Sequence, residues 1–346
     1  MKKNYVAYIG SYTFHGSSKG ISIMDVDVEN GRFIKRKEIR VNNSSYLTVS
    51  HDQHYLYSIV DEGVASFKIL PDGNLKHLNT ATIKGMRGCF LTTDSKNQFL
   101  VVAGYHDGKM TVLRLKENGE VGHITAEVFD RGIGSVAERN FSPHISCVQF
   151  TPDEQFLCMV DLGIDQVKIF KFDHDDGSVR MIDILHCELN SAPRHLRFSA
   201  DGKYMYLISE LKNYITVHNY YVNKKGHPEF EFKQLVSAAC ALRFSEDGKY
   251  AFCSNAGDNS VGFYKIDEEN GLLRVQSILP ISGDYPKDIA IFPDGKHFVS
   301  VNQDSGTLTF FTIDYAKGII VMNGHPLPLD NGNCCVIVPV EEAYHS

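Results

Sequence analysis

One stretch of this chain reads LRFSADGKYMY (residues 196–206), and it recurs as LRFSEDGKYAF (242–252) and IAIFPDGKHFV (289–299). Each copy holds an alternating apolar run, an Asp-Gly turn and a second, more continuous apolar run. A tight Asp-Gly turn between two β-rich runs is among the strongest local signals for a β-hairpin. Weaker copies centre on Asp52, Asp94 and Asp153. The six turn aspartates therefore lie between 42 and 59 residues apart, which indicates a repeat architecture.

The rest of each repeat indicates a propeller blade. A polar break and a third apolar run follow the hairpin, and a second glycine turn leads to a fourth, looser run. Four antiparallel strands in about 45 residues form one blade. Residues 5–10, 20–26 and 31–33 resemble the second to fourth strands of a further blade, and residues 334–339 resemble its first. We therefore predict a single all-β domain over residues 1–346, a seven-bladed β-propeller closed by strands from both chain ends, with very little helix.

Composition narrows the class of protein. A formal net charge of −7 argues against nucleic acid or an anionic membrane as the main partner. No segment reads as a signal peptide or approaches a membrane span, and the 8 cysteines form no CxxC motif. We therefore expect a cytoplasmic protein with reduced, mostly buried thiols, present as a monomer or weak homodimer. No metal, phosphate-loop or dinucleotide motif occurs, so no metal or cofactor is predicted.

The order of strands and turns in each repeat also predicts which face of the propeller holds the functional site. Residues that precede the first strand and follow the second lie at one end of each blade, about 20 Å from the Asp-Gly turns. Innermost strands line the central channel, so the side chains at their entrance converge on the axis. The turn face offers only turn residues. We expect a funnel for a small polar or anionic ligand, with these candidate binding residues: Tyr46, His195, Asn255, Asp258, Lys287, Gln303 and Asp304.

The sharpest cluster on that face is Arg194 with His195, followed by Glu210. An arginine can hold a carboxylate, a phosphate or a developing oxyanion, and a glutamate near a histidine can activate water. The alternative is an ion pair that ties two strand ends together. His144 enters the next position, after about a dozen extra residues around 130–141. Such an insertion suits a ligand loop or a neutral surface loop equally well.

These residues also carry a family resemblance that spans essentially the whole chain. The chain resembles the seven-bladed propeller lactonases, which include cytosolic 6-phosphogluconolactonases and fungal carboxymuconate-lactonising enzymes. The resemblance implies metal-independent lactone chemistry, with Glu210 as general base and with Arg194 and His144 stabilising an oxyanion. Its carriers are residues 8–13 (YIGSYT), 43–47 (NSSYL), 142–144 (SPH), 161–163 (DLG), 193–196 (PRHL) with 209–211 (SEL), and 302–305 (NQDS).

Departures from the family pattern keep three functions open. Ala256 stands where relatives carry an arginine, Cys240 replaces a glutamate, Lys287 replaces an arginine and Ser146 replaces a second histidine. The first hypothesis is hydrolysis of a sugar lactone, 6-phosphogluconolactone or a related aldonolactone. The second is a lactone-forming cycloisomerase acting on a muconate-type polycarboxylate. The third is a non-catalytic propeller that binds a small molecule or a protein through the same face.

Overall fold

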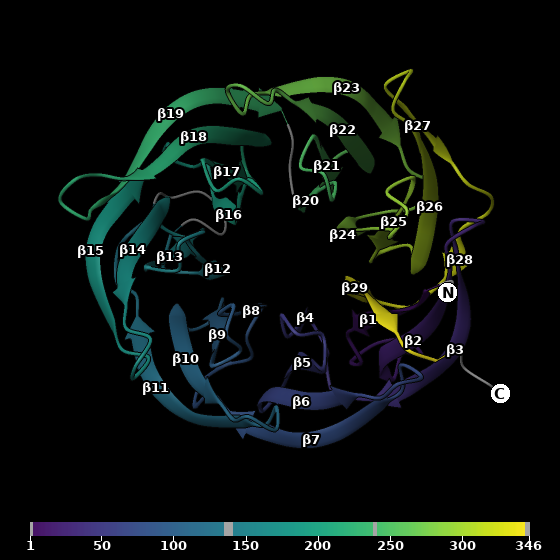
Figure 1. The fold of residues 1–346 in the computed structure, drawn as a ribbon, viewed down its shortest axis with the longest axis horizontal. Helices are drawn as coiled ribbons and strands as arrows, with labels where there is room; N and C mark the ends of the chain where they lie inside the picture. The colour runs from purple at the N-terminus through teal and green to yellow at the C-terminus, as the bar shows by residue number, and fades with distance from the viewer. Residues whose placement is uncertain (1–2, 135–140, 238–240, 343–346) are drawn as a thin grey trace.

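The chain folds into a ring of seven antiparallel sheets around a central axis (Figure 1). The structure is a computed structural model that describes residues 3–134, 141–237 and 241–342, and these ranges contain strands and turns but no helix. Within these described ranges, six sheets have four strands, and the seventh has four strands in its main path plus a short fifth. The prediction of a seven-bladed, all-β propeller is confirmed.

Each sheet begins with its innermost strand and runs outward. The sheet that joins both chain ends contains β29 (Gly332–Val340), β1 (Asn4–Ser11), β2 (Gly20–Asp27) and β3 (Arg32–Arg40). The second sheet contains β4 (Leu47–Val49), β5 (Tyr55–Val60), β6 (Gly63–Ile69) and β7 (Leu75–Thr82). The third contains β8 (Phe90–Thr93), β9 (Phe99–Gly104), β10 (Lys109–Leu115) and β11 (Val121–Phe129). The fourth contains β12 (Ile145–Phe150), β13 (Phe156–Asp161), β14 (Gln166–Phe172) and β15 (Val179–His186). The last three contain β16 (Pro193–Phe198), β17 (Tyr204–Ser209), β18 (Tyr214–Val222), β19 (Pro228–Ser237); β20 (Leu242–Phe244), β21 (Tyr250–Asn255), β22 (Ser260–Ile266), β23 (Leu273–Pro280); and β24 (Pro286–Ile291), β25 (His297–Asn302), β26 (Thr307–Asp314), β27 (Ile319–Met322), with β28 (Leu327–Pro328) beside β26.

The ring closes through β1 and β29. These strands pair antiparallel from Asn4 opposite Val340 to Ser11 opposite Gly332, so the C-terminal strand is the innermost strand of a sheet whose other three strands come from the N-terminus. This is the closure expected from the sequence. It pairs a strand edge that a linear array would leave open.

In four of the sheets a hydroxyl and an aspartate hold the turn between the first two strands, at one end of the channel. In the hairpin of β16 and β17, Ser199 Oγ lies 2.6 Å from Asp201 Oδ1 and accepts the Tyr204 N–H at 3.0 Å. The same pattern recurs with Ser50, Thr151 and Ser245 as the hydroxyl residue. The repeated aspartates are therefore structural, because they fix the turn that joins the first two strands.

The prediction that Asp94 is the turn aspartate of its repeat was wrong by two residues. The Asp94 N–H donates to the Phe99 carbonyl at 3.2 Å, as the Ser199 N–H donates to the Tyr204 carbonyl at 2.9 Å. Asp94 therefore occupies the hydroxyl position of its hairpin, and Lys96 occupies the position of the turn aspartate. The sequence pattern aligned the two because each offers an aspartate just before a polar turn.

The core lies between neighbouring sheets, where the apolar side chains of the inner three strands interlock. Tyr8 and Tyr206 are fully buried, and each donates its hydroxyl to a glycine carbonyl in the outer turn of the next sheet, at 2.7 and 2.8 Å. The cysteines in the described ranges are all free thiols. Within those ranges we find no helix with the length and apolar character needed to cross a bilayer.

Candidate active site

A pocket lies at the mouth of the channel, at the end opposite the Asp-Gly turns. Every innermost strand, or the residues just before it, contributes to its wall. The contributions, in ring order, are Asn333, Ser45, Cys89, Ser146, Arg194, Arg243 and Lys287. This convergence follows from the propeller itself, since the inner strands of all seven sheets start at the same end.

Four of the predicted residues line this pocket, namely Tyr46, Arg194, His195 and Lys287. Arg194 lies in β16 and Glu210 directly follows β17, and the two strands are hairpin partners that pair Pro193 with Ser209. Arg194 Nη1 forms an ion pair with Glu210 Oε2. The two side chains are 22% and 19% exposed, so the pair is sheltered without being sealed from solvent. A guanidinium and a carboxylate thus meet at the pocket edge, and the pair also joins two strand ends.

His144 meets the pocket through one of its wall residues. Its ring lies parallel to that of Tyr105, with 4.4 Å between centroids and 8° between planes. Tyr105 lines the pocket, and its carbonyl oxygen lies 2.7 Å from His144 Nδ1. If this nitrogen donates to the carbonyl, Nε2 carries the lone pair of the neutral ring. His144 is thus fixed in orientation beside the pocket.

Asp161 positions His144 from behind. Its carboxylate is buried and accepts the backbone N–H groups of His144 and Gly163, both at 2.9 Å. Burial, together with the neighbouring Asp130 carboxyl, raises the pKa of Asp161 to about 7. Asp130 also forms an ion pair with Lys168. The backbone of His144 is therefore held by a carboxyl whose charge depends on pH.

Replacing Asp161 by Asn should make the folded state less sensitive to pH. The pKa of this carboxyl is near 3.8 in the unfolded chain and about 7 in the folded one. Its contribution to the free energy of unfolding is therefore fully present below pH 3.8 and is lost as the pH rises through about 7. Asn keeps the acceptor oxygen and never ionises. We expect the variant to exceed the wild type in stability by about 1–3 kcal/mol above pH 7 and by less near pH 4. Urea unfolding from pH 4 to 8.5 checks this, with the exposed-site variant Asp304→Asn as control; parallel curves for Asp161→Asn and wild type would contradict it.

The pocket wall carries an excess of positive charge. Arg194, Arg243 and Lys287 face one wall carboxylate, Asp288, which lies 2.5 Å from Arg243. This excess stands out in a chain with a net charge of −7. Burial raises the pKa of the Cys89 thiol to about 12 against the opposing effect of Arg194, so Cys89 is a neutral wall residue and not a nucleophile. The arrangement favours an anionic or oxyanion-forming ligand.

The other predicted binding residues do not belong to this wall, taking the described residues together. Asn255 is buried and donates to Ser260 Oγ at 2.9 Å, and Ser260 Oγ in turn lies 2.7 Å from Asp258 Oδ1. They form a local turn network after β21. Gln303 and Asp304 form the turn after β25, with backbone N–H groups bonded to residues 285 and 284. Ala256 is half-buried in the turn after β21. Cys240 and residues 135–140 of the predicted insertion lie outside the described residues.

Sequence reasoning missed several wall residues. Arg243 and its repeat equivalent Arg197 lie in the repeated stretches 242–252 and 196–206, which were interpreted as scaffold. The side chains of an inner strand, however, point alternately into the blade and into the channel. Arg197 Nη1 lies 2.9 Å from Gln149 Oε1 deeper in the channel. Tyr12 packs against Arg87, whose guanidinium carbon lies 5.0 Å from the ring centroid. Asn333 comes from the closing strand. The alternation along the inner strands was the signal that could have identified the arginines.

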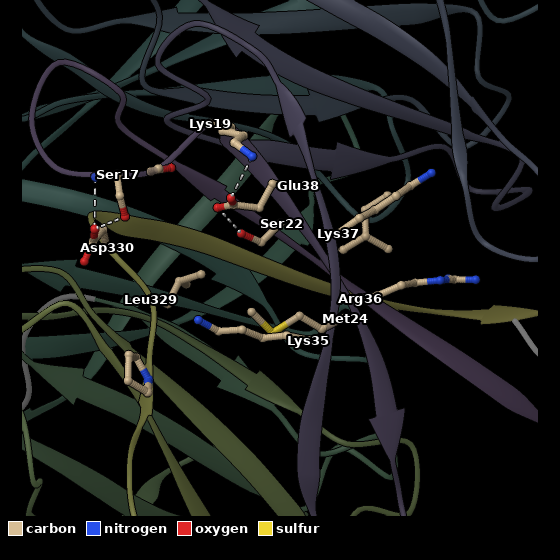
Figure 2. Close-up of a pocket in the computed structure, with 13 residues that line it drawn as sticks. Ser17, Lys19, Ser22, Met24, Lys35, Arg36, Lys37, Glu38, Leu329 and Asp330 are labelled. Atoms are coloured by element: carbon tan, nitrogen blue, oxygen red, sulfur yellow. Dashed lines mark hydrogen bonds and ion pairs between the residues drawn. The ribbon is translucent and has the colours of Figure 1, made fainter. Parts of the chain in front are cut away.

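A second hollow lies on the outer side of the ring, beside β2 and β3 (Figure 2). Its polar groups already bind one another: Ser17 donates to Asp330 at 3.0 Å, and Lys19 pairs with Glu38 at 4.0 Å. Figure 2 shows Arg36 and Lys37 extending away from the hollow. Only one sheet and a short C-terminal segment form it, so the channel mouth, where seven strands converge, is the better candidate site.

Comparisons with known proteins agree with this geometry. Residues 6–337 match the family model described as "Lactonase, 7-bladed beta-propeller". The 6-phosphogluconolactonase of Bacillus subtilis is 29% identical over 334 residues, covering 92% of this chain and 94% of that protein. That of Formosa agariphila is 28% identical over 331 residues, covering 90% and 93%.

Solved structures give the same result. A Bacteroides fragilis protein, provisionally assigned as a 6-phosphogluconolactonase, superposes with a TM-score of 0.89 and 29% identity over 97% of this chain and 98% of its own. The periplasmic gluconolactonase of Pseudomonas aeruginosa superposes with a TM-score of 0.90 and 25% identity over 97% and 99%. The family match spans nearly the whole propeller, including six of the inner strands and residues 332–337 of β29. This chain therefore belongs to the seven-bladed β-propeller lactonase family.

Proposed function

We propose that this protein hydrolyses a sugar lactone at the channel mouth, with 6-phosphogluconolactone or a related aldonolactone as the substrate. The observation that carries the proposal is the Arg194–Glu210 pair at the edge of a pocket with excess positive charge. A general base beside an oxyanion-stabilising cation is what ester hydrolysis requires. Lys287 and Arg243 supply further positive charge for a phosphate or hydroxy-acid group of the substrate. We expect the enzyme to act in the cytoplasm as a monomer or weak homodimer, without a metal or cofactor at this pocket.

In the proposed reaction Glu210 accepts a proton from a water molecule, and the water oxygen forms a bond to the lactone carbonyl carbon. The negative charge that develops on the carbonyl oxygen is stabilised by Arg194 and His144. Collapse of the tetrahedral intermediate breaks the bond between the carbonyl carbon and the ring oxygen, and the ring oxygen takes the proton back from Glu210. The product is the open-chain aldonic acid. Substrate binding must loosen the ion pair first, because the paired carboxylate is a weaker base.

The test is hydrolysis of 6-phosphogluconolactone and unphosphorylated gluconolactone by the purified protein, measured against the spontaneous rate at the same pH. We expect turnover above background, with the phosphorylated substrate preferred because of the cationic wall. Failure to exceed background on either lactone would overturn the proposal. Muconate-type polycarboxylates are the second set of substrates, since lactone formation from them would assign the same residues to the cycloisomerase alternative. Ligand binding with no turnover on any of these would favour the non-catalytic alternative.

A further inference from the structure

The turn face contains a hairpin with a carboxylate where four other hairpins have a hydroxyl. In four hairpins a serine or threonine hydroxyl accepts the N–H of the returning strand, whereas β8 and β9 have Asp94 at that position. Asp94 Oδ1 performs this task by accepting the N–H groups of Gln98 and Phe99, at 2.7 and 2.6 Å. The turn therefore needs only one oxygen of this carboxylate. Its second oxygen, Oδ2, is surplus to the hairpin.

That second oxygen is buried, and a nitrogen of a histidine in the next sheet is buried and unused as well. The Asp94 side chain has no solvent exposure, and Oδ2 has no hydrogen-bond partner among the described residues. His174, in the turn after β14 of the next sheet, has a buried Nδ1 that likewise lacks one within the described ranges. His174 Nε2 lies 2.8 Å from the Glu154 carbonyl. A carbonyl can only accept, so Nε2 carries the proton and Nδ1 presents its lone pair.

The ring of His174 is held in place. It packs edge to face on Phe172, with 4.8 Å between centroids, and lies nearly parallel to Phe150 at 6.3 Å. A histidine that donates one ring N–H to a backbone carbonyl keeps its other nitrogen available, which is the usual arrangement of a metal ligand.

Glu154 completes the cluster from the hairpin of β12 and β13. It stands where three other hairpins have glycine, and it adopts a left-handed backbone with a φ of 53°. Its two carboxylate oxygens accept the Ser95 N–H and hydroxyl, each at 2.7 Å, so the side chain reaches across to the hairpin that contains Asp94. One ligand atom from each of Asp94, Glu154 and His174 lies within 4.8 Å of the others.

We propose that Asp94, Glu154 and His174 form a binding site for a divalent transition-metal cation of the zinc class. Two carboxylates and one neutral imidazole balance a 2+ charge, and their ligand atoms lie at separations that a tetrahedral ion with bonds of about 2.0–2.2 Å can bridge with small adjustments. The imidazole favours zinc over magnesium or calcium, which prefer oxygen ligands alone. Water would fill the fourth position.

The role of this site is structural. Asp94 belongs to one sheet and Glu154 and His174 to the next, so a bound ion links two adjacent blades through their turns. The turn face is about 20 Å from the pocket mouth, the length of an inner hairpin. Binding to the folded chain alone raises its stability as the free metal concentration exceeds the dissociation constant. The inference is independent of the proposed lactone chemistry.

Titration of untagged, chelator-treated full-length protein with ZnCl2 tests the site by calorimetry and thermal unfolding. We expect one zinc ion per chain and a higher Tm with zinc, and weaker responses to MgCl2 and CaCl2. The repeat supplies matched variants: Asp94→Ser and Glu154→Gly install the residues that other hairpins use, so both should fold. Each should weaken zinc binding by more than about tenfold. Glu246→Gln, an exposed carboxylate on the same face, should bind zinc like the wild type.

Binding that is unchanged in both Asp94→Ser and Glu154→Gly, or no stoichiometric zinc binding by the wild type, would overturn the site. Tighter binding of calcium than of zinc would overturn the metal class. The metal-free Tm of each variant separates loss of a ligand from loss of the fold. Lactone hydrolysis by the Asp94→Ser variant should match the wild-type rate, so a failure of the proposed enzyme function and a failure of the metal site give different results.

Discussion

Replacement of Glu210 by Gln is expected to lower kcat for lactone hydrolysis by about 10²–10⁴-fold, the range associated with a general base. Gln has nearly the same shape and keeps an oxygen for the contact with Arg194. It cannot accept a proton from water, so the attack step loses its base while the pocket wall stays intact. KM should change little. Steady-state kinetics on the best lactone, corrected for spontaneous hydrolysis, measure both quantities.

Arg194→Ala and Asp201→Asn are the informative companions to this variant. Loss of the guanidinium should raise KM as well as lower kcat, because Arg194 would contact substrate and oxyanion alike. Asp201 belongs to the turn face, about 20 Å away, and its variant should retain activity. A Glu210→Gln enzyme with the wild-type kcat would remove Glu210 from the mechanism. The pair with Arg194 would then be the strand-end tie that the sequence also allowed.

The sequence was sufficient for the fold because the repeated hairpins are local. The Ser-x-Asp-Gly turn around Asp201 fixes its own geometry through Ser199, and the copies around Asp52, Asp153 and Asp247 repeat the same contacts. The periodicity then determines which residues share a face. This is why Arg194 and Glu210, 16 residues apart, could be placed together before the structure was known.

The parts that could not be predicted depend on which partner each polar side chain binds, either in its own turn or in a neighbouring sheet. Asn255 was placed in the funnel by its position at the end of β21, but its amide donates to Ser260 at the start of β22. The shift at Asp94 was hidden because one aspartate can replace the hydroxyl of a neighbouring position. Arg243 and Asp288 meet from adjacent sheets, and no single repeat contains both partners.

Removal of the Asp288 carboxylate should have the largest effect on the free energy of unfolding. The Asp288 side chain is only 4% exposed and lies 2.5 Å from Arg243. It also accepts the backbone N–H groups of Ile289 and Cys335, at 2.8 and 3.0 Å. Cys335 belongs to β29, the strand that closes the ring. Asp288→Ala would leave a cation and two N–H groups unsatisfied at the closure, and we expect a loss of about 3–5 kcal/mol.

A double-mutant cycle determines whether the loss of stability in Asp288→Ala comes from the unpaired Arg243 guanidinium. Arg243→Met removes the guanidinium while keeping an apolar chain of similar length, so Asp288→Ala should cost less in that background than in the wild type. Asp288→Asn, which retains an acceptor for the Cys335 N–H, should fall between the wild type and Asp288→Ala. Denaturant unfolding of the four cycle members and the Asn variant measures this. A cost for Asp288→Ala below about 1 kcal/mol would mean that water replaces the carboxylate at the channel mouth and that the closing strand β29 is held by its pairing with β1 alone.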